Sequence, residues 1–219
     1  MNTKIGSMFK LFGFFLLFYL ICLAMWLSLK APYQSVINTV AFKTSAWIYD
    51  IKMLNIEQLS DQTTLITATN SYASIDLDGK DSRVVFDITL DIDAITFNVP
   101  MTLALLLAII TTLKTTKKQK VDALINGMAL LAALHFVTMF IVCISLIIGV
   151  AEQSDALSTY LQHRWMPREL LINLGSFLSS YAARFEPFLI AVLIWWSIKS
   201  KEEQGVQATS ASEPKLPSF

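Results

Sequence analysis

The sequence is poor in charged residues and in cysteine. Only 16% of its 219 residues are charged, against about 25% in soluble domains. Lys+Arg and Asp+Glu balance at 17 each, so the net charge gives no reason to expect a nucleic-acid partner. Cys22 and Cys143 stand far apart inside apolar segments, which argues against a disulfide scaffold and a zinc site. We therefore expect no metal and no cofactor.

In place of charge, the chain has four long apolar stretches. They cover Met8–Leu29, Thr96–Leu113, Val121–Val150 and Leu170–Ile198. A helix of about 20 apolar residues crosses a hydrocarbon core about 30 Å thick. Because backbone polar groups in lipid must be paired within their own segment, the stretches are expected to be helices. The sequence predicts an α-helical membrane protein with four transmembrane helices.

The first stretch could be either a signal peptide or an anchor. It follows a basic start, as a signal peptide does, but its apolar run continues to Leu29 with no polar region before a cleavage site. This pattern favours an uncleaved anchor.

Lysine placement predicts the orientation. Lysines precede the first stretch, separate the second from the third, and follow the fourth: Lys4, Lys10, Lys114, Lys117, Lys118, Lys120, Lys199 and Lys201. An excess of Lys and Arg marks the cytoplasmic side, so both termini are expected in the cytoplasm. The chain then divides into a stub and first helix (1–29), an extracytoplasmic insertion (30–95), three further helices (96–198) and a disordered cytoplasmic tail (199–219).

The insertion is predicted to begin with a second helix at Pro32, because the residue before a proline avoids helical geometry. Its apolar residues form two stripes on nearly opposite faces. The first runs from Tyr33 to Leu54 and includes Trp47; the second consists of Phe42, Ala46, Tyr49 and Met53. A helix lying on a membrane needs only one apolar face. The second face is therefore expected to meet either the protein's own β-segment or a partner protein.

Residues 56–95 change to a period of two. Phe86–Ile92 alternates apolar with polar residues, and Thr63–Thr69 and Ser71–Leu77 also have strand-like compositions. Asp78-Gly79 suits a hairpin turn. We expect a small antiparallel sheet of about three strands, too small to be stable alone. Its aspartates match a calcium loop poorly, because Ser74 and Val85 occupy the two anchor positions.

Three ionisable residues lie deep in the third and fourth stretches. His135 and Arg184 are each about 22 Å from the flanking lysines, and Glu186 lies nearby. Ionisable groups at such depth face protein or a water-filled cavity. His135, Arg184 and Glu186 are therefore predicted to form an intramembrane polar cluster, with either a structural or a chemical role.

The fourth stretch also carries a helix-packing pattern. Gly175, Ser179 and Ala183 recur every four residues, a spacing at which small side chains let helices approach closely in lipid. Pro187 is expected to kink the helix next to Glu186. The packing partner could belong to this chain or to another.

A catalytic centre is not expected. Cys143, Arg184 and His135 are the residue types of exosortases, but Cys143 and His135 are about 12 Å apart along one helix. The chain also lacks hydrolase, zinc-protease and P-loop motifs.

Two short stretches nevertheless carry a family resemblance. Asp93–Pro100 leads directly into Met101–Leu106, and Arg184–Leu189 is followed by Trp195-Trp196. With one N-terminal anchor and an outer α/β segment, this layout resembles the small membrane proteins associated with exosortase H in proteobacteria. The resemblance implies an accessory role in protein sorting at the bacterial inner (plasma) membrane, and it supplies no catalytic residues.

Two functions follow from these observations. The first is a non-enzymatic accessory subunit, embedded in the bilayer, that docks a larger integral membrane protein such as an exosortase-type transpeptidase. The alternative is an intramembrane enzyme or transport component that uses His135, Arg184 and Glu186.

Overall fold

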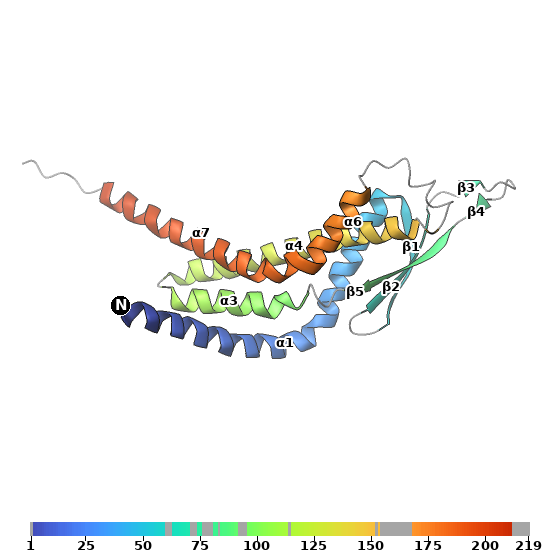
Figure 1. The fold of residues 1–219 in the computed structure, drawn as a ribbon. Helices are drawn as coiled ribbons and strands as arrows, with labels where there is room; N and C mark the ends of the chain where they lie inside the picture. Colours follow the sequence, from blue (N-terminus) through green and yellow to red (C-terminus); the bar gives the residue numbers. More distant parts are fainter. Residues whose placement is uncertain are drawn as a thin grey trace, which may run out of the picture.

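The computed structural model describes residues 2–59, 63–70, 74–75, 81–82, 84–91, 96–113, 115–151, 153 and 168–211. Its helices are α1 (Asn2–Ile48), α3 (Asn98–Thr112), α4 (Lys117–Ala151), α6 (Arg168–Phe177) and α7 (Ala183–Ala211), with a π-helical turn, η1 (Leu178–Ala182), between the last two. In Figure 1, α1, α3, α4 and α7 form an elongated bundle with a small sheet at one end.

Among the described residues, three helical segments are long and apolar enough to cross a membrane: Met8–Ile48, Lys117–Ala151 and Glu169–Ser200. They indicate a membrane protein. The second predicted span corresponds to α3, a helix of 15 residues, or about 22 Å. α3 packs against α1, α4 and α7, and eight of its 15 residues are buried.

The predicted helix break at Pro32 is wrong. α1 continues through Pro32 to Ile48, and Figure 1 shows it turning toward the sheet in its second half. A proline has a helix-compatible φ and removes only one hydrogen bond, here the one to the carbonyl of Ser28, so a helix held by tertiary packing bends instead of ending. The helix ends before Asp50, whose φ of 49° turns the chain into the first strand. The predicted helical stripe through Leu54 is therefore wrong beyond Ile48.

The predicted small antiparallel sheet of three strands between the first two apolar helices is confirmed, but one of its strands differs. Ile51–Gln58 takes part, whereas the described part of the predicted strand Ser71–Leu77 pairs elsewhere. β2 (Thr63–Asn70) lies between β1 (Ile51–Gln58) and β5 (Val85–Asp91). Ile66 pairs with Ile88 across β2 and β5, and both side chains are buried. β3 (Ser74–Ile75) and β4 (Asp81–Ser82) form a separate two-stranded ladder. The predicted Asp78-Gly79 turn lies outside the described residues.

The sheet covers the second apolar face of α1. Phe42, Ala46 and Tyr49 are buried in one core with sheet residues such as Ile66 and with the α4 residue Met139. Met53 lies in β1 and packs against the same core. Of the two covers expected for this face, the structure shows the protein's own sheet, together with α4, so these four residues do not form a partner or membrane face. Only Trp47 of that set faces outward, with 77% of its surface exposed.

Candidate functional site

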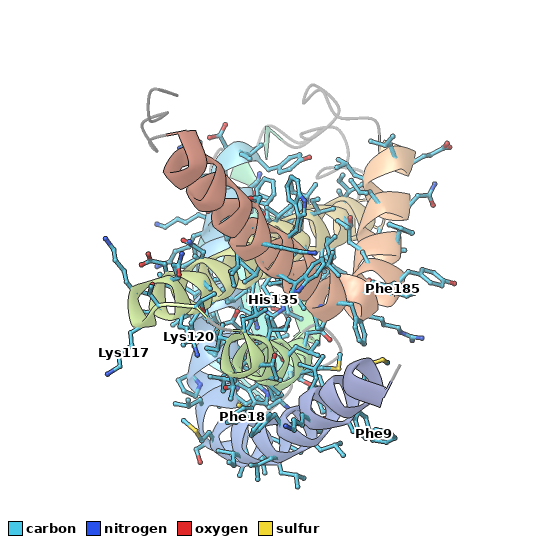
Figure 2. The ribbon with its side chains drawn as sticks, turned by 90° about the vertical axis from the view of Figure 1, so that its left-hand side faces the viewer. Phe9, Phe18, Lys117, Lys120, His135 and Phe185 are labelled. Carbon is cyan, nitrogen blue, oxygen red and sulfur yellow. The ribbon has the colours of Figure 1, made fainter. Side chains whose placement is uncertain are left out.

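A polar network at the centre of the bundle joins four helices. The Tyr33 hydroxyl of α1 lies 2.8 Å from Nδ1 of His135 in α4. Nε2 of the same imidazole lies 3.1 Å from Oε2 of Glu186 in α7. Oε2 also accepts a hydrogen bond of 3.2 Å from the Asn98 side chain at the start of α3. Figure 2 places His135 in the interior of the bundle.

The side chains of His135 and Glu186 are buried, so their polar atoms need partners within the protein. His135 is 0% exposed and Glu186 is 6% exposed, and polar groups without partners at such positions are costly. The neutral imidazole tautomer with its hydrogen on Nε2 suits both neighbours, because Nδ1 can then accept from Tyr33 while Nε2–H faces the carboxylate. Nε2 makes no well-formed hydrogen bond at this distance, so the His135–Glu186 contact is mainly electrostatic.

Pro187 explains why Asn98 belongs to the network. A proline cannot donate to the carbonyl four residues earlier, which here is the carbonyl of Ala183. The side-chain nitrogen of Asn98 donates to that carbonyl as well as to Glu186. One amide from α3 therefore pairs both the backbone oxygen released by Pro187 and the adjacent carboxylate.

A buried polar seam on α1 extends from this network toward the sheet. Gln34, Asn38 and Ser45 are buried and share one face of the helix. The Gln34 amide donates to Thr96 at 2.8 Å, and the Asn38 amide donates to Thr64 of β2 at 3.0 Å. The Ser45 hydroxyl lies 3.2 Å from the Phe140 carbonyl of α4. The seam fixes the second half of α1 to α4 and to the sheet.

Arg184 is not a member of the cluster. Its side chain is exposed, whereas Glu186, two residues later, is buried. Residues two apart on a helix point about 160° apart, so the turn that directs Glu186 inward directs Arg184 outward. The structure brings His135 and Glu186 together and replaces the predicted arginine with Tyr33 and Asn98.

The small-residue stripe faces α4 of the same chain. A Cβ atom at Gly175 would lie 2.6 Å from Oγ of Ser145, whose hydroxyl donates to the Leu171 carbonyl at 2.9 Å. Ala183 is buried in the core, and Ser179 is half-buried, with its hydroxyl bonded to the Gly175 carbonyl. This stripe therefore lets α6 and α7 approach α4.

A second pattern on α6, η1 and α7 faces outward. Large apolar side chains at intervals of three or four residues are 54% to 68% exposed. We call this set the aromatic stripe: Phe177, Tyr181, Phe185, Phe188, Val192 and Trp196. Figure 2 shows Phe185 directed away from the bundle. Sequence reasoning missed the stripe, although its spacing was readable.

Other chemistry is sparse in the described residues. Cys143 is fully buried in the apolar core, while the ring nitrogens of His135 face α1 and α7. Within the described ranges, no group of three or more His, Cys, Asp or Glu side chains is placed to hold a metal ion.

Comparisons of the chain with models of protein families, with curated proteins and with solved structures find no match. In the part of the chain that the structure describes, three long apolar helices and a small antiparallel sheet indicate a mostly helical membrane protein.

Proposed function

We propose that the protein is a non-enzymatic accessory subunit of the bacterial inner membrane that docks a larger integral membrane protein. It crosses the bilayer four times, with α3 as the second span, and both termini are cytoplasmic. The partner is a protein-sorting transpeptidase of the exosortase type, as the layout and the two short stretches imply.

The observation that carries this proposal is how the buried polar side chains are used. Tyr33, Asn98, His135 and Glu186 come from four different helices and contact one another. Nδ1 of His135 contacts the Tyr33 hydroxyl and Nε2 faces the Glu186 carboxylate, so both ring nitrogens point at groups of the same chain and neither is directed at a substrate. A network used in this way holds helices in register, which suits a scaffold better than a reaction centre.

The aromatic stripe is the proposed docking face. In lipid, helices associate through close packing and not through a hydrophobic driving force, and aromatic side chains are enriched where proteins meet. Phe177 and Tyr181 are already stacked, with ring centroids 6.0 Å apart, so part of the face is ordered before docking. Arg184, Phe185, Phe188 and Leu189, from one stretch that carries the resemblance, are exposed here.

Co-purification tests the docking face. In mild detergent, Tyr181→Ala with Phe185→Ala is expected to reduce recovery of the partner about tenfold or more, because one interface hot spot contributes about 2 kcal/mol. The matched control is Phe9→Ala with Phe12→Ala, two exposed aromatic residues of α1. Mass spectrometry of the recovered chain tests its identity as a sorting enzyme. Unchanged recovery with the first pair would mean that the stripe faces only lipid.

The competing proposal is an intramembrane enzyme or transport component, which an ionisable His135–Glu186 pair at membrane depth favours. Glu186→Gln separates the two. The accessory function predicts that stability and partner recovery fall together with sorting output. The chemical function predicts lost output from a stable, fully assembled protein. Asp122→Asn, which removes a carboxylate at an exposed position of α4, controls for altered charge.

A further inference from the structure

An apolar cavity lies beside the polar network, between α1, α3 and α4. Its volume is about 470 Å³, and it is open on one side. Its wall on α1 extends from Cys22 to Val36, and α3 and α4 contribute side chains such as Leu103 and Met128. The surface that lines it is entirely apolar. It therefore offers no hydrogen-bond partner to a polar ligand.

The dimensions of the cavity restrict its occupant. Fourteen residues of α1 separate the ends of that wall, a rise of about 21 Å, so the cavity is elongated along α1. A helix is about 10–12 Å in diameter with its side chains and is too wide. Non-bonded carbon atoms lie about 3.5–4.0 Å apart, so an extended hydrocarbon chain is narrow enough to lie along the cavity.

Two prolines form part of the cavity wall. Pro32 and Pro100 both line the cavity, and neither has a backbone N–H group to be satisfied. α1 turns in its second half (Figure 1), while α3 stays beside its first half. The cavity therefore lies where α1 changes direction, and apolar side chains of the neighbouring helices line it.

Tyr33 connects the cavity to the polar network. It belongs to the cavity wall, and its hydroxyl contacts His135. The Tyr33 ring also packs edge-on against Trp26, another lining residue, at 5.3 Å between centroids. A hydrocarbon chain in the cavity would therefore pack beside Tyr33, the α1 side chain that contacts His135.

We propose that this cavity binds one acyl chain of a membrane phospholipid, which enters sideways from the bilayer. The chain completes the packing of α1 on α3 and covers the Tyr33 side of the network. The site is independent of the identity of any protein partner, and it requires only that these helices lie in lipid.

Fluorescence quenching of Trp26 tests the site in the full-length protein. The other tryptophans are replaced by phenylalanine: Trp47, Trp165, Trp195 and Trp196. The protein is reconstituted in vesicles of phosphatidylcholine with mid-chain bromine atoms, mixed in steps with unbrominated phosphatidylcholine. Trp26 emission is expected to fall by half or more in fully brominated vesicles. The fall is expected to be proportional to the brominated fraction, because a single lipid occupies the site.

A variant that fills the cavity supplies the second measurement. Leu103→Phe places a ring in the cavity and is expected to remove at least half of the quenching. Leu189→Phe, a change at an exposed position of α7, is expected to remove none. Circular dichroism confirms that both variants are folded. Absence of quenching in the parent, or a curved dependence typical of many annular lipids, would overturn the proposal without reference to either variant. Equal quenching in Leu103→Phe and the parent would also overturn it.

Discussion

Asn98→Ala is the most informative change to the polar network. The substitution removes the donor to the Ala183 carbonyl and to the Glu186 carboxylate. A buried hydrogen bond contributes about 0.5–1.5 kcal/mol, and one to a charged group about 1.5–3 kcal/mol. Hydrogen bonds between membrane helices are weaker, averaging about 0.6 kcal/mol. We therefore expect the free energy of unfolding to fall by about 2 kcal/mol, with about 1 kcal/mol from the Ala183 contact.

A double-mutant cycle that combines Asn98→Ala with Pro187→Ala tests this expectation. An alanine at 187 restores a backbone N–H group, which can donate to the Ala183 carbonyl within α7. In that background, Asn98→Ala is expected to cost about 1 kcal/mol less. The assay is reversible unfolding in mixed micelles as the fraction of denaturing detergent rises. Equal losses in the two backgrounds, within the usual additivity error of about 0.3–0.5 kcal/mol, would refute the assignment of Asn98 as the substitute donor.

Two further predictions concern packing and orientation. Gly175→Leu is expected to lower thermal stability by several degrees, because even its Cβ would lie 2.6 Å from Ser145, whereas Leu174→Ile is expected to change it little; equal stability would show that α6 can move away from α4 at no cost. A membrane-impermeant thiol reagent added from the periplasmic side is expected to label a cysteine substituted for Asp78 but not one substituted for Lys117, in a background without native cysteines, and the reverse pattern would overturn the proposed orientation.

The part of the fold that follows from local periodicity could be predicted. Strict alternation in Phe86–Ile92 predicted β5, and Thr63–Thr69 predicted β2, because one face of each strand had to be buried. The two apolar faces of α1 required a cover on each side. The sheet provides one, since it encloses Phe42. Periodicity fixes which face is buried, so these features needed no knowledge of distant contacts.

The continuity of α1 could not be predicted in the same way. Pro32 disfavours a helix locally, and the predicted break followed from that local preference alone. The helical conformation persists because Gln34, Asn38 and Ser45 are bonded to the β2–α3 region and α4. Those partners are distant in sequence. Tertiary packing therefore outweighed the cost of one lost backbone hydrogen bond, which is modest when neighbouring turns are held in place.

The polar network could be predicted only in part from the depth of its residues in the bilayer. Counting residues from the lysines placed His135 near Glu186, and they are in contact. Depth alone could not choose the rotation of α7, so it included Arg184, which faces outward. The missing constraint was Pro187: the Ala183 carbonyl that it releases needs a donor, and in lipid a neighbouring helix can supply one. Asn98, two residues before Pro100 at the start of an apolar helix, was the available amide. A search for donors to satisfy each proline-released carbonyl would have selected the inward face of α7, and with it Glu186 in place of Arg184.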